Sequence, residues 1–251
     1  MRNHLVAGNW KMNGDLIMSS NLIKELVENL ENLDEHTLVV CPPFPMLSSV
    51  SQQIQNTSLL LGSQNLSEFS CGAYTGETSA LMLKDVGCHY VIIGHSERRV
   101  IMQESNEMVA AKFIAAVDND LIPIICIGET LEEKEQGLTK QVIQEQLNLI
   151  VNNDNIAQLE RSVIAYEPVW AIGRGLSANP SEAQDIHAFI RSIISSKSEE
   201  IAAKIQIIYG GSVTKRNASE LFSMPDIDGG LIGGASLDAS EFLSIAKAIN
   251  K

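Results

Sequence analysis

The sequence predicts one (β/α)8 barrel that takes up the whole chain, residues 1–251. Short apolar runs that resemble strands alternate with longer runs of helical spacing, at roughly 30 residues per pair, which fits a barrel of about 250 residues. Most of the short runs are continuously apolar, as is typical of parallel strands buried on both faces. No linker, low-complexity tract or block of charge divides the chain, so we expect a single domain.

Eight segments are predicted to be strands, and the segments between them to be helical. The predicted strands are Leu5–Trp10, Leu38–Cys41, Leu59–Ser63, Tyr90–Gly94, Ile122–Ile127, Val163–Tyr166, Ile205–Tyr209 and Gly230–Ile232. Apolar stripes at helical spacing include Leu22, Ile23, Leu26, Val27 and Leu30. Two helix starts are marked by a capping residue with glutamate three positions later, at Asn179 and at Asp238. An open doubly wound sheet is the alternative, but no glycine-rich fingerprint follows the first strand.

Composition and charge restrict the class of function. The formal net charge is −13 and no basic stripe is present, so nucleic acid is not expected as a partner. Cys41, Cys71, Cys88 and Cys126 lack the spacing of a zinc site or a disulfide framework, which favours a reducing compartment. No secretory signal or transmembrane run is found, so we expect a soluble, cytoplasmic protein.

A lone carboxylate, Glu167, ends the apolar run Val163–Tyr166 and is followed at once by Pro168. Because proline lacks the ladder N–H, a buried strand cannot continue through it. Glu167 therefore lies at the carboxyl end of a strand and at the start of an apolar loop, where a base covered by a closing loop would be expected. An exposed strand-end glutamate beside an ordinary turn is the alternative.

Two other strand ends carry polar side chains, and barrel active sites are built from such ends. In Asn9–Lys11, alternation puts the asparagine and the lysine on the same side, and the lysine could neutralise an anionic substrate. A solvated lysine is the simpler interpretation of that segment alone. The segment Gly94–Arg99 places an imidazole directly at the end of the fourth strand, followed by a dense polar cluster.

Glycine pairs follow the last two strands, in Gly210–Ser212 and Gly233–Ser236. Backbone N–H groups that no side chain covers suit a phosphate, and barrel enzymes often bind phosphate with these two loops. Two tight turns that simply need glycine are the alternative. One cation, one imidazole, one carboxylate and two anion-binding loops together favour proton abstraction next to a carbonyl, with a phosphate as a binding handle.

Six segments resemble the triosephosphate isomerase family, in the family's order and over nearly the whole chain. They are Gly8–Gly14, Cys71–Glu77, Ile93–Arg99, Ala165–Gly173, Tyr209–Val213 and Gly233–Leu237. The resemblance implies an enzyme that interconverts dihydroxyacetone phosphate and glyceraldehyde 3-phosphate through an enediolate. It implies no cofactor and no metal, and a place in glycolysis and gluconeogenesis.

The resemblance also implies roles for single residues. Glu167 would be the base and His95 the neutral electrophile, a pairing for which this family is itself the standard example, while Lys11 would stabilise the negative charge of the substrate. The implied substrate-binding residues are Asn9, Lys11, Gly173, Ser212, Gly233 and Gly234, and the implied supporting residues are Glu97 and Cys126. The loop that begins near Pro168 would be a lid over the site, again a standard example from this family.

A homodimer is implied as well, built around the segment Cys71–Glu77. Thr75 would lie beside the partner subunit's Asn9 and the partner subunit's His95. Glu77 would pair with the partner subunit's Arg98. The residues alone predict only a long, exposed loop after the third strand.

The chain departs from the usual pattern of the family at three positions. Arg174 stands where threonine is usual and Leu176 where lysine is usual. We expect these two to change the kinetics of the lid rather than the reaction, with Arg174 as a solvated surface charge. Gly230 stands where the family usually has a larger residue, which predicts a small packing deficit in the last strand.

Two other kinds of function compete with an isomerase. Another phosphate-binding barrel, such as a sugar-phosphate aldolase, would need a Schiff-base lysine at a strand end, and Lys11 is the strand-end lysine present. An inactive barrel that serves as a scaffold would predict the loss of Lys11, His95 or Glu167, all of which are present.

Overall fold

The computed structural model describes residues 2–30, 36–151, 156–172 and 178–249. In these segments eight parallel strands close into a barrel in the order of the sequence, with β8 paired to β1, so the predicted fold class is confirmed. The strands are β1 (His4–Asn9), β2 (His36–Cys41), β3 (Leu59–Ser63), β4 (Tyr90–Ile93), β5 (Ile122–Ile127), β6 (Val163–Tyr166), β7 (Gln206–Tyr209) and β8 (Gly229–Ile232).

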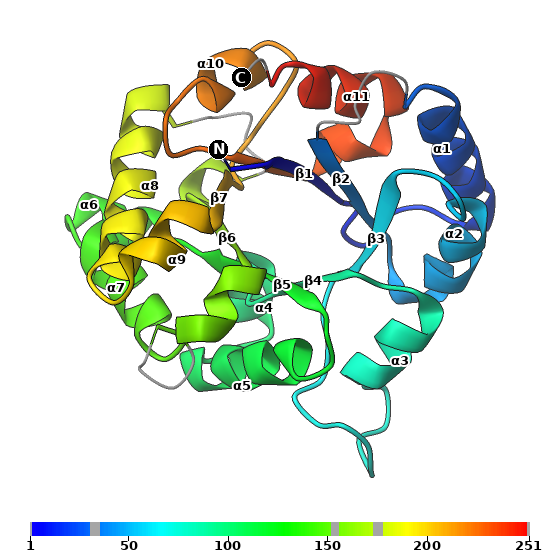
Figure 1. Cartoon of the computed structure of the whole chain (residues 1–251), viewed down its shortest axis with the longest axis horizontal. Coiled ribbons are helices and arrows are strands. Elements are labelled where there is room, and N and C mark those ends of the chain that lie inside the picture. Colours follow the sequence, from blue (N-terminus) through cyan, green and yellow to red (C-terminus); the bar gives the residue numbers. More distant parts are fainter. Residues whose placement is uncertain (1, 31–35, 152–155, 173–177, 250–251) are drawn as a thin grey trace.

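Helices surround the barrel as an outer ring (Figure 1). They are α1 (Leu16–Glu28), α2 (Leu47–Gln53), α3 (Ala80–Val86), α4 (Ser96–Ile101), α5 (Asn106–Val117), α6 (Leu131–Glu135), α7 (Thr139–Asn148), α8 (Pro180–Ser195), α9 (Glu199–Lys204), α10 (Ala218–Phe222) and α11 (Ala239–Lys247). Short 3-10 helices are η1 (Phe44–Met46), η2 (Ile156–Arg161), η3 (Val169–Ala171) and η4 (Gly234–Leu237). None of the helices in the described segments is long and apolar enough to cross a membrane.

Both predicted helix starts are confirmed. At the start of α8, Oδ1 of Asn179 accepts a hydrogen bond of 3.0 Å from the N–H of Ser181. At the start of α11, Oδ1 of Asp238 accepts one of 2.8 Å from the N–H of Glu241. A capping side chain satisfies an N–H group that has no partner inside the helix, so each helix begins where the capping residue stands.

The strand side chains alternate between two apolar layers. Leu5, Ala7 and Val39 belong to a cluster made of strand residues, which fills the interior of the barrel. Val6 and Leu38 belong to the larger cluster that packs the strands against the helices. Because both faces of each strand are buried, the sequence shows continuous apolar runs instead of an alternating pattern.

The strand boundaries differ from the predicted ranges by one or two residues for local reasons. β1 ends at Asn9 instead of Trp10, and Lys11 then turns the chain away with a φ of 53°. β4 ends at Ile93 instead of Gly94, because the glycine has a φ of 63°, which a strand cannot contain. The apolar stripe that predicts the first helix extends to Leu30, two residues beyond the last residue of α1.

The predicted packing deficit at Gly230 is wrong. A Cβ atom at this position would lie 2.8 Å from Cδ1 of Ile232 and 3.1 Å from Cζ of Phe222, so neighbouring side chains already fill the space. At Gly229, with a φ of 137°, a Cβ atom would lie 1.9 Å from the carbonyl oxygen of Leu5. The two glycines let β8 pass close to both β1 and α10.

Candidate active site

A cavity of about 520 Å³ opens at the carboxyl ends of the strands. Among the residues predicted for the site, those that line it are Asn9, Lys11, His95, Glu167, Ser212, Gly233 and Gly234. They come from segments up to 225 residues apart, and closure of the barrel brings them together. Gly173, Arg174 and Leu176 lie outside the described residues.

Glu167 lies at the inner wall of this cavity. Val163 and Ala165 of β6 face the barrel interior, so the alternation of the strand directs Glu167 inward as well. Its side chain is 2% exposed. Oε1 lies 2.9 Å from Nε2 of His95, and Oε2 accepts a hydrogen bond of 2.9 Å from the N–H of Ser96. Both carboxylate oxygens therefore have partners within the protein.

His95 joins the end of β4 to the start of α4. The left-handed backbone of Gly94 breaks the alternation of β4, and His95 lines the cavity as a result. As the N-cap residue of α4, it accepts a hydrogen bond of 3.2 Å at Nδ1 from the N–H of Glu97. An Nδ1 that accepts carries no proton, so a neutral imidazole has its proton on Nε2, the atom that faces Glu167.

The two groups influence each other's pKa. Burial, the largest influence on Glu167, raises its pKa, but His95, the N–H of Ser96 and Lys11 outweigh it, and the pKa lies below the ordinary glutamate value. Burial lowers the pKa of His95, whereas the charge of Glu167 and its hydrogen bond raise it, and the net direction is upward. The carboxylate is therefore ionised at neutral pH, as a base has to be.

Lys11 is held at the cavity by an ion pair and by its own backbone. Its Nζ lies 2.6 Å from Oε1 of Glu97, a residue that is predicted to support the site. Its N–H donates to Oδ1 of Asn9 at 3.0 Å, and its carbonyl oxygen accepts from Nε2 of Gln64 at 2.8 Å. These bonds hold a non-glycine residue at positive φ, a conformation that costs of order 1 kcal/mol or more and is common at functional sites.

The glycine-bearing loops form one wall of the cavity. A Cβ atom at Gly234 would have no heavy atom within 4 Å, and one at Gly233 would meet only Cε of Lys11, at 3.5 Å. The helix η4 begins at Gly234, and the first N–H groups of a helix have no intrahelical partner. Ser212 lines the same wall, and its Oγ donates to the carbonyl oxygen of Ala171 at 2.9 Å. This wall offers N–H donors to an anion.

Cys126 lies behind Glu167, outside the main cavity. It faces the barrel interior from β5, is fully buried, and interacts with the carboxylate of Glu167. Burial and this carboxylate raise the pKa of the thiol well above its ordinary value, so the thiol stays neutral. A neutral sulfur beside the carboxylate adds no second negative charge there.

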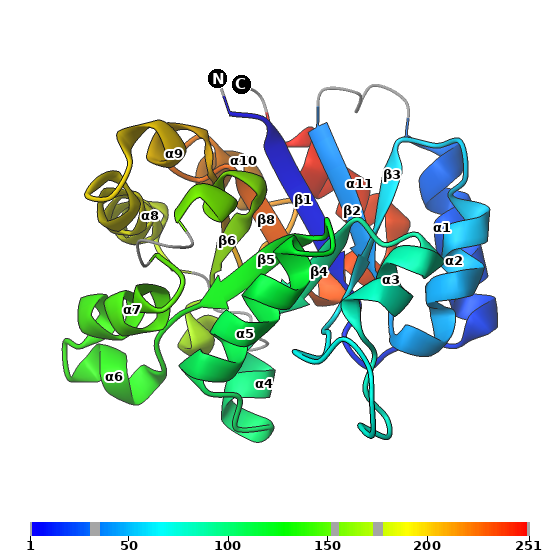
Figure 2. The same cartoon turned by 60° about the horizontal axis from the view of Figure 1, so that its bottom comes forward.

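The residues predicted for a dimer do not line the cavity of their own chain. Thr75 and Glu77 are exposed on the loop between β3 and α3, which extends away from the barrel (Figure 2). Arg98 of α4 is bound within the chain, since its Nε lies 2.5 Å from Oε1 of Glu104.

Three groups of the site were not among the predicted residues. The N–H of Ser96 holds Glu167, and the side chain of Gln64 supports Lys11. Glu129 accepts hydrogen bonds from Nε1 of Trp170 at 2.8 Å and from the hydroxyl of Tyr166 at 3.1 Å. Ser96 lies inside a segment that the sequence singles out, but Gln64 acts across 53 residues and Glu129 across 37 and 41, which no local pattern can show.

With this geometry, comparison with known proteins gives one answer. The family model described as triosephosphate isomerase matches residues 4–249. The chain belongs to the triosephosphate isomerase family. The triosephosphate isomerase of Nitrosomonas eutropha is 53% identical to it over 243 residues, 97% of this chain and 96% of the relative. That of Thiobacillus denitrificans is 51% identical over 251 residues, all of both chains. That of Nitrosococcus oceani is 50% identical over 248 residues, 99% of each.

Membership of the triosephosphate isomerase family identifies the reaction. The chain is an isomerase that interconverts dihydroxyacetone phosphate and glyceraldehyde 3-phosphate, and glycolysis is the usual role of the family. The predicted enzyme class is confirmed. Neither an aldolase nor an inactive scaffold is needed to explain the site.

Proposed function

We propose that this chain performs the isomerisation by proton transfer through an enediolate, with Glu167 as base, His95 as electrophile and Lys11 as the stabilising cation. The observation that carries the proposal is the contact of 2.9 Å between Oε1 of Glu167 and Nε2 of His95 at the wall of the cavity. Lys11 lines the same cavity. A carboxylate and an imidazole in one substrate-sized cavity can act on neighbouring carbon and oxygen atoms.

The proposed steps balance without a further reactant. Glu167 takes a proton from carbon 1 of dihydroxyacetone phosphate, and the electron pair of that bond forms the double bond of the enediolate. The Nε2–H of His95 donates to the oxygen on carbon 2, where negative charge develops. His95 then exchanges protons with the two oxygens, and Glu167 returns a proton to carbon 2 to give the aldehyde. Lys11 and Asn9 stabilise the charge on the oxygens.

Glu167 has to leave its resting partners before it can face a substrate. Gly210 gives it room, because a Cβ atom there would lie 2.8 Å from Cγ of Glu167. Once the carboxylate has moved, His95 loses the contact that raises its pKa most, and burial and Lys11 then favour the neutral imidazole against the remaining influence of Glu97. The same movement thus exposes the base and prepares the electrophile.

The phosphate of the substrate would bind at the wall of the cavity that the glycine-bearing loops form. We assign it to backbone N–H groups of Gly233, Gly234 and Gly173, and to Ser212. Of these, Gly173 lies outside the described residues. The local N–H donors are needed because a net charge of −13 repels an anionic substrate at long range.

Isotope exchange tests the proton-transfer mechanism. We expect that dihydroxyacetone phosphate held at equilibrium with the enzyme in D2O gains deuterium on carbon 1, because the acid formed from Glu167 exchanges with solvent before it returns the proton. Mass spectrometry measures the label, and a sample without enzyme is the control. Product that stays free of deuterium after many turnovers would contradict proton abstraction and favour direct hydride transfer.

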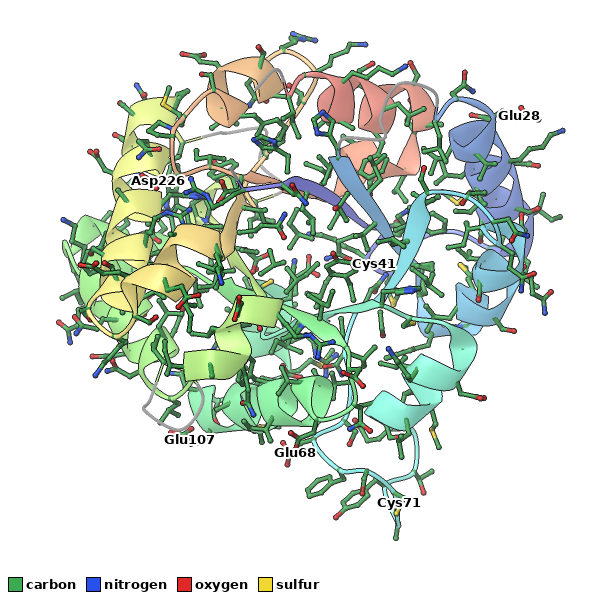
Figure 3. All side chains as sticks on the ribbon, viewed as in Figure 1. Glu28, Cys41, Glu68, Cys71, Glu107 and Asp226 are labelled. Atoms are coloured by element: carbon green, nitrogen blue, oxygen red, sulfur yellow. The ribbon has the colours of Figure 1, made fainter. Side chains whose placement is uncertain are left out.

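We also propose that the chain forms a homodimer around the loop between β3 and α3. Phe69 and Tyr74 stack on each other in this loop, with ring centroids 4.0 Å apart, and both remain partly exposed. Cys71 lies at the outer end of the same loop, far from the barrel wall that holds Cys41 (Figure 3). Met12 is 95% exposed, Phe69 42% and Tyr74 43%, and a subunit contact that covered these side chains would remove apolar surface from water.

In this dimer Thr75 would complete the neighbouring site. Replacing Thr75 by arginine is expected to lower the dimer content and the activity together, because a charged side chain would replace a small one in the contact. Size-exclusion chromatography with light scattering measures the first quantity and a coupled assay the second. Asn148→Arg, on the exposed face of α7, is the matched control. Full activity in a demonstrated monomer would refute the role of the loop.

We propose the cytoplasm as the compartment. All four cysteines are free, and Cys41, Cys88 and Cys126 are also buried. Free cysteines fit a reducing environment. Because the reaction is reversible, gluconeogenesis can use it as well as glycolysis.

A further inference from the structure

Arg99 of α4 lies behind the proposed catalytic pair and has no role in the mechanism above. It is partly buried, and no carboxylate of the described residues lies within ion-pair distance of it. Its neighbour Arg98 shows the usual arrangement, with Nε 2.5 Å from the carboxylate of Glu104. A permanent cation without an ion-pair partner, next to an active site, needs an explanation.

The guanidinium of Arg99 instead joins two strand ends. Nε donates to the carbonyl oxygen of Gly94 at 2.8 Å, and Nη2 to the carbonyl oxygen of Cys126 at 3.2 Å. Nη1 donates to Oδ1 of Asn106 at 2.7 Å, which anchors the fork from outside. The planar fork of arginine presents its donors to several acceptors in a fixed geometry, whereas the ammonium of lysine is a compact charge on a flexible stem.

Each of these two backbone carbonyl groups belongs to the residue just before one that carries or holds a side chain of the site. Gly94 is followed by His95. Cys126 is followed by Ile127, whose carbonyl oxygen accepts a hydrogen bond of 2.7 Å from the N–H of Glu167. The guanidinium packs closely against Gly94, because a Cβ atom at Gly94 would lie 2.9 Å from Nη2 of Arg99. The fork therefore sets the spacing between the segments that carry the imidazole and the carboxylate.

Arg99 also places positive charge behind the base. Arg99 and Glu167 line a second cavity, of about 210 Å³, on the far side of the carboxylate from the substrate. The titratable and charged groups that act on Glu167 include His95, Lys11, Cys126 and Arg99, and Glu133 lines the same second cavity. Burial lowers the pKa of Arg99 and outweighs Cys126, Glu167 and Glu104, which raise it, so the net direction is downward. The charge of Glu167 favours the charged guanidinium, and the guanidinium in turn favours the ionised carboxylate.

We propose that Arg99 is a positioning residue for the isomerisation: its fork holds the ends of β4 and β5 at the spacing that His95 and Glu167 require, and its charge keeps the base ionised from behind. This inference rests on the proposed roles of His95 and Glu167. It assigns no contact with substrate to Arg99.

Two substitutions separate the fork from the charge. Arg99→Lys keeps the charge and loses the fork, so we expect kcat to fall about tenfold or more with KM changed less than about twofold, because small misplacements of a base are costly. The acid limb of the pH profile of kcat/KM, which reports the free enzyme, should stay in place. Arg99→Gln loses both, and its acid limb should also move up by about one pH unit. Arg161→Lys and Arg161→Gln, at an exposed arginine paired with Asp120, are the controls.

Circular dichroism and chromatography establish that each variant is folded and assembled like the wild type. A wild-type kcat in Arg99→Lys overturns the positioning role, and this variant decides the question alone if Arg99→Gln does not fold. An unshifted acid limb in folded Arg99→Gln overturns the role of the charge. Glu167→Gln is assayed in parallel. If it is inactive while Arg99→Lys is unaffected, only the inference on Arg99 fails, whereas an active Glu167→Gln removes the proposed base itself.

Discussion

Replacing Glu167 by aspartate is expected to lower kcat about a hundredfold while KM changes far less. The substitution withdraws the carboxylate by one methylene, and a misplacement near 1 Å can cost about that factor. The substitution leaves Lys11 and the glycine-bearing loops proposed to bind the phosphate intact, so binding of the substrate should persist. A coupled assay over a range of glyceraldehyde 3-phosphate concentrations measures both constants.

Glu145→Asp is the matched control, because Glu145 lies exposed on α7 and loses the same methylene. Glu167→Gln extends the test, since its amide keeps the shape but cannot accept the proton, and turnover should be abolished. If Glu167→Asp instead raised KM and left kcat unchanged, the carboxylate would be a binding group and not the base.

Replacing Glu104 by glutamine is expected to be the most destabilising of these changes. The carboxylate is 2% exposed and holds both Arg98 and Lys112, and Lys112 is itself buried and also donates to Asn65. A neutral amide would leave the buried ammonium of Lys112 without its counter-charge, and breaking a buried pair in this way costs about 3–5 kcal/mol. Thermal unfolding followed by circular dichroism measures the loss, with Glu145→Gln as the exposed control.

The same pair makes a prediction about pH. Burial raises the pKa of Glu104, but the hydrogen bonds from Lys112 and Arg98 outweigh it, and the pKa in the folded protein lies below the ordinary value. A lowered pKa stabilises the fold above the unfolded-state pKa, about 4.3, and this contribution disappears as pH falls through the folded-state pKa. The melting temperature of Glu104→Gln should therefore fall less steeply than that of the wild type below about pH 4.3. Parallel curves would contradict the assignment.

The sequence predicts the barrel well because its strands and helix starts have regular patterns within short segments of sequence. Strands buried on both faces are continuously apolar, as around Val6 and Ala7, and capping residues such as Asn179 mark where helices begin. Glu167 can be found in the same way, because a proline directly after it ends the strand. Each of these patterns can be recognised from a few neighbouring residues.

Other parts of the structure have no local sequence pattern that predicts them. Gln64 reaches the backbone of Lys11 across 53 residues, and only closure of the barrel brings the two together. At Gly230 the sequence misled, because a missing side chain suggests empty space, whereas Phe222 and Ile232 occupy it. Whether a glycine leaves a gap depends on what packs against it, and that is decided by the tertiary structure.

The contacts of the Glu167 carboxylate limit its reaction with molecules other than a substrate. Both of its oxygens are occupied by protein donors, at His95 and Ser96, and its side chain is almost entirely shielded from water. A small electrophile without a phosphate brings no binding energy to offset the loss of those two contacts, so it meets a shielded nucleophile. Under the proposed mechanism only a substrate with its phosphate would displace the carboxylate, so we expect slow reaction with alkylating agents that lack a phosphate.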